Sequence, residues 1–211
     1  MMQDRARETA AILLRLGAVS INTREPFTYT SGIKSPIYTD NRLLISYPED
    51  RRRITKFLVA AADEAVGVAN IDLVAGTATA GIPFAAWLAD SLQRPMVYVR
   101  GATKGHGLGR QIEGRLVPRQ RAIVVEDLIT TGGSSLATVD ALSAHGAIVS
   151  CCLAIFSYGL AGATRAYEKR DVLLVPLTTL DVLLEVAVAS NYITQADAAT
   201  VSTWAAGLER G

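Results

Sequence analysis

The chain has 211 residues, enough for one substantial domain with its own hydrophobic core. Half of the residues are hydrophobic and 19% are charged, a balance that excludes an intrinsically disordered protein. The formal net charge of +1 is too small to indicate binding to nucleic acid or to an anionic membrane, so we expect neither as a partner.

The N-terminal residues and the two cysteines are typical of a protein from a reducing compartment. No apolar run approaches the ~18 residues of a membrane span, and charged residues from Asp4 to Glu8 argue against a signal peptide. Cys151 and Cys152 are adjacent in an apolar, strand-like run, and neighbours on a strand face opposite sides. We therefore predict two buried thiols and a cytoplasmic protein.

The first predicted elements are a helix over residues 9–16, ended by Gly17, and a hairpin within residues 27–42 around Ser31 and Gly32. The hairpin is rich in Thr, Ser, Tyr, Lys and Arg, which is unusual for a core hairpin. One interpretation is a solvated edge hairpin. The other is a hood that offers hydrogen bonds and an aromatic wall to a planar ligand.

The next segment predicts a helix, a strand and a second helix. Proline is favoured in the first turn of a helix, so Pro48 is expected to begin a helix that ends near Val66. A strand over residues 71–75 leads into the small-residue turn 76–81 and a helix over residues 82–92. The turn would let the backbone approach a ligand closely, but tight packing explains it equally well.

Residues 100–114 follow a predicted strand at 95–99 and contain five glycines but little apolar surface. Such a segment cannot fill a core, so we predict an exposed loop. Its potentially cationic side chains are Arg100, Lys104, His106 and Arg110. One interpretation is a solvated, flexible connection between two elements. The spacing of the cations favours the other, a lid that closes on a polyanion.

Residues 121–134, RAIVVEDLITTGGS, are the most informative stretch. A strand-like run is followed by Glu126 and Asp127, then by a Thr- and Gly-rich turn, with Ser134 where a helix would begin. Free N–H groups and the positive end of the helix dipole would form an anion site. The acidic pair beside it favours a sugar phosphate over an ordinary strand-to-helix turn with capping residues.

The remaining predicted elements are strands over residues 147–156 and 172–175 and helices over residues 165–169, 178–189 and 194–208. Strands that alternate with helices predict an α/β fold with a parallel sheet. Ligands gather at the carboxyl ends of such strands, which places the loops after Ala75, Val99 and Val125 on one rim.

Residues 124–134 resemble the phosphoribosyl pyrophosphate (PRPP) binding motif of the type I phosphoribosyltransferases. Within that family, the F-T-x-x-S-G-x-K-S-P-x-Y pattern of residues 27–38 is similar to that of the orotate phosphoribosyltransferases, and residues 100–114 match their catalytic loop. The resemblance covers residues 17–158. It implies a type I phosphoribosyltransferase-like central parallel sheet flanked by helices, in a single domain over residues 1–211. A hood over residues 1–47 would cover the base, and residues 48–211 would form the α/β core.

The resemblance also implies a reaction. Ribose 5-phosphate would pass from PRPP to orotate in the presence of Mg²⁺, giving orotidine 5′-phosphate and pyrophosphate in de novo pyrimidine synthesis. The enzyme would be a homodimer whose subunits share the catalytic loop. The alternatives are transfer to another base and a non-catalytic regulator that senses PRPP, although the regulator would tend to lack the loop. A nucleotide-binding P-loop is disfavoured, because the motif contains no Gly-Lys-Ser/Thr.

The expected site residues fall into three groups. The expected catalytic residues are Arg100, Lys104, His106 and Asp127. The expected PRPP-binding residues are Arg100, Lys104, His106, Glu126, Asp127, Leu128, Ile129, Thr130, Thr131, Gly132, Gly133 and Ser134. The expected orotate-binding residues are Lys34, Tyr38, Arg42 and Thr130. We expect Mg²⁺ to be held near Asp127 through substrate and water, with no direct protein ligand assigned.

The sequence departs from the family pattern at several positions. Many members have a lysine where this chain has Gly101, and some have lysines where it has Thr30 and Ala80. An arginine that binds the orotate carboxylate in some members has no clear counterpart near Tyr158. Lys34 and Arg42 are therefore the candidates to replace it.

Overall fold

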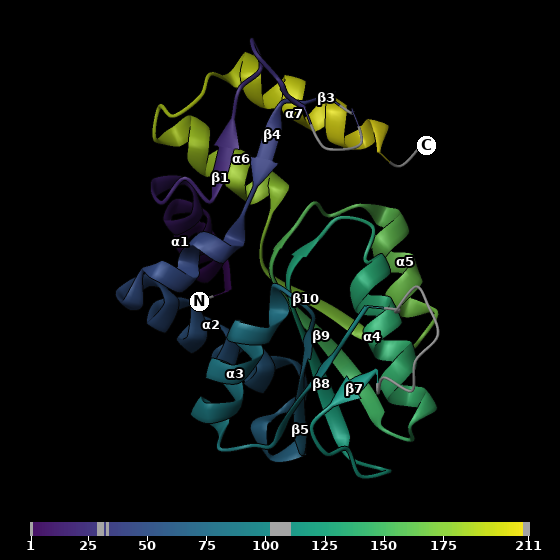
Figure 1. Cartoon of the computed structure of the whole chain (residues 1–211). Helices are drawn as coiled ribbons and strands as arrows, with labels where there is room; N and C mark the ends of the chain where they lie inside the picture. Colours follow the sequence, from purple (N-terminus) through teal and green to yellow (C-terminus); the bar gives the residue numbers. More distant parts are fainter. Residues whose placement is uncertain (1, 29–31, 33, 102–110, 209–211) are drawn as a thin grey trace.

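The computed structural model describes residues 2–28, 32, 34–101 and 111–208. Its centre is a six-stranded sheet with the strand order β10-β9-β8-β5-β6-β7 (Figure 1). The strands are β5 (Leu73–Thr77), β6 (Met96–Val99), β7 (Ile112–Glu113), β8 (Arg121–Ile129), β9 (Ile148–Ser157) and β10 (Leu173–Thr179). All pairings are parallel except that of β6 with β7, so the predicted α/β fold with a central, mostly parallel sheet is confirmed.

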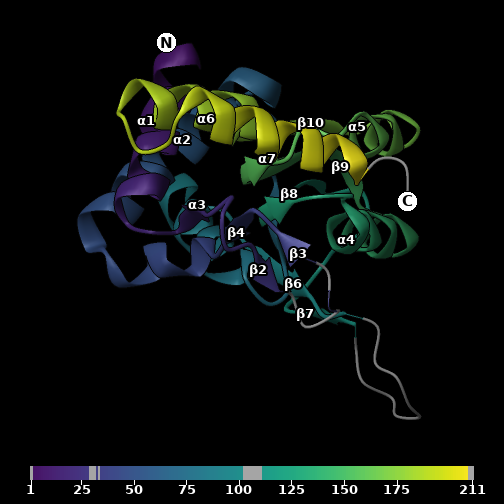
Figure 2. The ribbon, with the colours of Figure 1, turned by 90° about the horizontal axis from the view of Figure 1, so that it is seen from above.

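Helices cover both faces of this sheet. The helices are α1 (Met2–Arg15), α2 (Pro48–Val66), α3 (Gly81–Leu92), α4 (Gly133–Ala144), α5 (Ala161–Glu168), α6 (Leu180–Ala189) and α7 (Gln195–Gly207). Helices α2 and α3 pack against one face, and α4 and α5 against the other, as the view in Figure 2 shows. Because both faces are covered, the central strands read as continuous apolar runs rather than as alternating ones.

The sheet interior confirms the expectation for the two cysteines. Cys151 and Cys152 lie in β9 as buried free thiols. Burial raises the pKa of Cys151 to about 12, so its reactive thiolate form is disfavoured at neutral pH. None of the helices in the described ranges combines the length and the apolarity needed to cross a bilayer.

Two small antiparallel pairs form the hood. Strand β2 (Phe27–Thr28) pairs with β3 (Lys34–Ser35), which confirms the predicted hairpin, although residues 29–31 and 33 at its tip lie outside the described residues. Strand β1 (Val19–Ile21) pairs with β4 (Ile37–Thr39), which the sequence analysis did not predict. A short 3-10 helix, η1 (Asn41–Ser46), completes the hood and leads into α2.

The C-terminal helices lie beside the hood rather than against the centre of the sheet (Figure 1). The indole Nε1 of Trp204 in α7 donates a hydrogen bond to the carbonyl oxygen of Lys34, 3.0 Å away. At the start of the same helix, Asp197 accepts a hydrogen bond from Thr23 and forms a capping box with Thr194. The expected helix at the C-terminus is confirmed, and its contacts place it with the hood.

Candidate functional site

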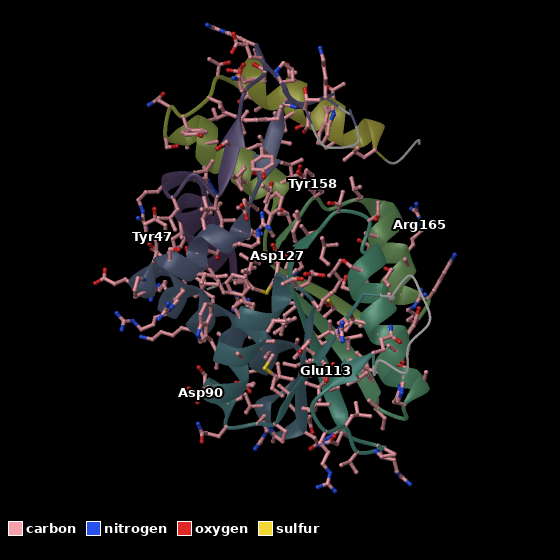
Figure 3. The ribbon with its side chains drawn as sticks, in the orientation of Figure 1. Tyr47, Asp90, Glu113, Asp127, Tyr158 and Arg165 are labelled. Atoms are coloured by element: carbon pink, nitrogen blue, oxygen red, sulfur yellow. The ribbon has the colours of Figure 1, made fainter. Side chains whose placement is uncertain are left out.

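The acidic pair lies at the carboxyl end of β8, on the side of the sheet that faces the hood, where Figure 3 labels Asp127. We expected the strand to end at Val125, and this was wrong: β8 continues to Ile129. The reason is the length of β9, which pairs with β8 as far as Ile129 and Ser157. Strand β5 pairs with β8 only as far as Val125, so the acids lie where the strand has lost one neighbour.

Burial makes this pair electrostatically costly. Burial raises the pKa of Glu126 to about 8, and the negative charge of Asp127 acts in the same direction. Burial also raises the pKa of Asp127, although hydrogen bonds and the nearby charge of Arg42 oppose that rise. At neutral pH the unliganded pair therefore retains a proton, and a ligand that brings hydroxyl donors or positive charge would favour its ionised form.

The start of α4 forms the second part of the site. After β8, Thr130 and Thr131 form the turn, and Gly132 begins the helix with φ +80°, a left-handed conformation that favours glycine. Within the described residues no side chain caps this helix start, so its first N–H groups are available to a ligand. Gly133 and Ser134 are exposed, as an anion site requires.

One hydrogen bond joins the two parts. The Ser134 hydroxyl donates to Glu126 Oε2 at 3.1 Å, and the backbone N–H of Asp127 donates to Glu126 Oε1, also at 3.1 Å. The structure thus brings the predicted motif together at one end of β8. A molecule with a phosphate at the helix start and hydroxyl groups at the acids would match both parts.

Close packing accounts for the glycines in the small-residue turn at residues 76–81. A β-carbon at Gly81 would collide with the carbonyl oxygen of Val125, and one at Gly76 would lie 3.0 Å from the β-carbon of Ala85. Both glycines therefore let α3 approach the sheet closely. The Ala78–Thr79 peptide bond in this turn is cis.

The hood contributes a residue that was not predicted from the sequence. Asn41 is fully buried, and its Nδ2 donates to the backbone carbonyl oxygen of Asp127 at 2.7 Å. This bond lies beyond the point at which β5 stops pairing with β8, so the side chain takes the place of a strand neighbour. An asparagine in a polar run looks like a turn residue, and no local signal marks it as a contact with the sheet.

The four residues expected to bind orotate lie in two places. Thr130 is in the turn after β8, whereas Lys34, Tyr38 and Arg42 belong to the hood. Arg42 pairs with Asp40 through two hydrogen bonds of 2.6 and 2.9 Å, and its side chain is 62% exposed. The Tyr38 ring packs against Phe27, with ring centres 5.7 Å apart, and stays partly exposed.

The cationic loop is described only at its ends. Arg100 is half exposed, and its Nη1 lies 3.4 Å from Glu113 Oε1 on the neighbouring strand β7. Its backbone N–H donates to the carbonyl oxygen of Gln111 at 2.8 Å. Strand β7 lies within the stretch that we expected to be loop, so that expectation was wrong for Ile112 and Glu113. Lys104 and His106 lie outside the described residues.

The donor set near β8 suits a hard cation that keeps much of its own coordination shell. Among the described residues there is no cluster of three or more His, Cys, Asp or Glu side chains that could enclose a metal ion. Glu126 and Asp127 offer oxygen ligands alone. Mg²⁺ prefers one or two carboxylates supplemented by substrate oxygens and water, so the residues present fit that ion.

Comparison with known proteins gives matches over most of the chain. Residues 51–177 match the family model described as a phosphoribosyl transferase domain. The chain is 50% identical over 198 residues to a protein of Listeria innocua serovar 6a named orotate phosphoribosyltransferase, with 94% of each chain covered. It is 47% identical over 201 residues to a Coxiella burnetii protein of the same name, with 95% of each chain covered.

A solved structure gives the same result. The crystal structure of orotate phosphoribosyltransferase from Aeropyrum pernix matches with a TM-score of 0.74 and 34% identity. The match covers 83% of this chain and 96% of that one.

Proposed function

Because the chain belongs to the orotate phosphoribosyltransferase family, we propose that it transfers ribose 5-phosphate from PRPP to a ring nitrogen of orotate. The products are orotidine 5′-phosphate and pyrophosphate, in the synthesis of pyrimidine nucleotides. The observation that carries this proposal is the shared position of an acidic pair and an uncapped helix start at the carboxyl end of β8.

The two parts of this site have complementary roles towards PRPP. The N–H groups of Gly132, Gly133 and Ser134, with the hydroxyl groups of Thr130 and Thr131, hold the 5-phosphate at the positive end of the helix dipole. Glu126 and Asp127 accept hydrogen bonds from the ribose hydroxyl groups. Leu128 and Ile129 continue β8 between the two parts and fix their separation.

The acidic pair also suits the transition state. As the bond between the sugar and pyrophosphate breaks, positive charge grows on the sugar ring. Carboxylates already held beside the ring stabilise that charge without having to reorganise. Their raised pKa values in the unliganded protein fit this role, because an approaching positive charge favours ionisation of both groups.

We infer that Mg²⁺ is the cofactor. Asp127, and with it Glu126, would hold the ion mainly through water and substrate oxygens, in keeping with the small number of protein ligands. When bound, the ion neutralises negative charge on the leaving pyrophosphate.

The loop that follows β6 is proposed to supply further positive charge. Arg100, Lys104 and His106 would contact the pyrophosphate and exclude water when substrate is bound. The family resemblance further suggests a homodimer in which each loop serves the partner's site. This arrangement, like the cytoplasmic location, stays a prediction.

The hood is proposed to bind the base. Lys34, Tyr38 and Arg42, together with Thr130, are the candidates to contact orotate. Arg42 already pairs with Asp40, so it would have to share or exchange that partner to bind the orotate carboxylate. Its nearness to Asp127, which is reflected in the pKa of both groups, supports a place beside the site.

The decisive experiment measures the loss of orotate absorbance in the presence of PRPP and Mg²⁺. We expect consumption that requires both additions and that falls sharply in Asp127→Asn. Tyr192→Phe, a change at an exposed side chain, serves as the control and should leave the rate unchanged. Consumption of hypoxanthine or uracil in place of orotate would contradict the proposed substrate.

A further inference from the structure

A cluster of buried polar side chains lies beneath the turn that begins α4. The hydroxyl groups of Tyr167 in α5 and Ser135 in α4 are 2.5 Å apart, and the Tyr167 hydroxyl oxygen also lies 3.5 Å from Cys152 Sγ in β9. All three side chains are at most 1% exposed. Buried polar groups of this kind tie elements together in a fixed geometry when they are satisfied.

The Tyr167 ring also packs against the turn at Gly132 from the side of the core. A β-carbon at Gly132 would lie 3.0 Å from Tyr167 Cε2 and 3.6 Å from its hydroxyl oxygen. Gly132 therefore lacks room for a side chain in addition to having a positive φ. The ring limits how far the turn can move towards the core.

The hydrogen bonds continue from the tyrosine to the backbone of the turn. The Ser135 hydroxyl donates to the carbonyl oxygen of Gly132 at 3.2 Å, and the same oxygen accepts from the N–H of Leu136 at 2.8 Å. A hydroxyl group has one proton to donate, so Ser135 then accepts from Tyr167. Burial raises the pKa of Tyr167 well above its ordinary value, so its hydroxyl keeps the proton that it donates.

Fixing the Gly132 carbonyl also fixes the next N–H group. In a trans peptide unit the C=O and N–H bonds point in opposite directions. The Gly132 carbonyl points along α4 towards Leu136, so the N–H of Gly133 points out of the helix start. That is the direction from which a phosphate would approach.

We propose that Tyr167 is a positioning residue for the 5-phosphate of PRPP, acting through Ser135 on the peptide between Gly132 and Gly133. This inference rests on the proposed function, because it assumes that the helix start receives that phosphate. Tyr167 does not touch the ligand. It holds the N–H donors in the orientation that binding requires, so that less ordering is needed when the ligand arrives.

The test is Tyr167→Phe, which removes the hydroxyl group and keeps the ring against Gly132. Calorimetry measures the affinity for ribose 5-phosphate directly, and steady-state kinetics give the KM for each substrate. We expect the dissociation constant of ribose 5-phosphate and the KM for PRPP to rise about 3- to 10-fold, the usual effect of one lost hydrogen bond. The KM for orotate should stay unchanged.

A second variant tests the pathway. Ser135→Ala removes the same link from the other side and should weaken ribose 5-phosphate binding by a similar factor. Because both changes break one chain of hydrogen bonds, the double variant should be little worse than either single one. Tyr192→Phe, the same chemical change at an exposed position, is the matched control and should alter none of these values.

The outcomes separate the inference from the proposed function. A Tyr167→Phe protein that is less stable but binds ribose 5-phosphate as well as the unaltered protein would show a merely structural role and overturn the inference. The inference would also be overturned if the double variant raised the dissociation constant by the product of the two single effects. Unchanged binding of ribose 5-phosphate by Ser135→Ala would overturn it as well. An unaltered protein that binds ribose 5-phosphate but does not consume orotate would contradict the proposed substrate alone.

Discussion

Glu126 is the residue at which the demands of the site and of stability conflict most directly. Its pKa is about 8 in the folded protein, against an ordinary value near 4.5. Between these two pH values the folded protein holds a proton that the unfolded chain has released. The free energy of unfolding therefore falls as the pH rises through this window, by an amount on the order of a few kcal/mol.

Glu126→Gln should remove much of this pH dependence, because glutamine has the same shape and no charge to lose. We expect the unliganded variant to be more stable than the unaltered protein at pH 8, and its turnover to fall by about tenfold or more. Thermal unfolding between pH 5 and about pH 8 measures the first effect, and orotate consumption the second. A variant with the same decline in stability as the unaltered protein would show that Glu126 is not the titrating group.

Lys104 allows a separate test of catalysis. We expect Lys104→Ala to lower turnover by about tenfold or more, because one positive charge that would neutralise the leaving pyrophosphate is lost. The folded state should be unaffected, so the melting temperature should match that of the unaltered protein. Lys169→Ala removes a lysine from an exposed position after α5 and is the control for charge alone. Near-normal turnover in Lys104→Ala would exclude the proposed role of the loop.

At the scale of elements, the hood depends on Asn41 for its contact with the end of β8. Asn41→Ala should lower the free energy of unfolding by about 1 to 3 kcal/mol, because the buried carbonyl of Asp127 loses its partner. We also expect the KM for orotate to rise more than the KM for PRPP, since the hood, which we propose binds the base, would be less firmly placed. Chemical denaturation and steady-state kinetics measure the two effects.

Asn22→Ala is a matched control within the hood. The Asn22 side chain accepts a hydrogen bond from the N–H of Glu25, so the substitution also removes one hydrogen bond. This bond stays within the hood and does not reach β8. Equal effects of the two substitutions on the KM for orotate would contradict the positioning role of Asn41.

Local signals explain which elements the sequence predicted well. Helix α2 runs from Pro48 to Val66 as expected, because a proline at its start and an apolar stripe define it within its own residues. The carboxyl end of β8 was not predictable in this way. Its length depends on pairing with β9, and acidic residues are uncommon in strands, so local propensity gave the wrong end point.

The supporting residues of the site were missed for the same reason. Asn41 contacts a residue 86 positions away, and Tyr167 contacts Ser135 across 32 positions. Motif spacing identifies residues that are close in sequence, such as Glu126 and Ser134. It carries no information about side chains that distant segments bring beneath a site.

At the scale of the whole molecule, both ends of the chain contribute to the hood. Trp204 in α7 donates to the carbonyl oxygen of Lys34, and Thr23 donates to Asp197. The hood is thus built on α7 as well as on the N-terminal strands. The α7 helix was expected to belong to the core, and its contacts show that it also supports the hood.

The proposed sharing of the loop between subunits makes a prediction about mixed dimers. Lys104→Ala and Asp127→Asn proteins should each be nearly inactive alone. If the loop of one subunit completes the site of its partner, a mixed dimer contains one site with both groups intact. Random exchange at equal concentrations should then restore about a quarter of the unaltered activity. Orotate consumption after exchange is the measurement, and no recovery in a verified mixed dimer would contradict loop sharing.

The two-residue strand β7 has a consequence for how this enzyme can change over evolutionary time. Its pairing with β6, together with the hydrogen bond between Arg100 and Gln111, holds the two ends of the proposed catalytic loop beside each other. Closing a loop becomes only slowly less favourable as it grows, by about 0.6 kcal/mol for each doubling of its length. Insertions, deletions and new cations between these anchors can therefore accumulate at nearly constant stability. If the loop takes part in catalysis as proposed, selection can adjust turnover through it while the sheet and its acidic pair stay the same.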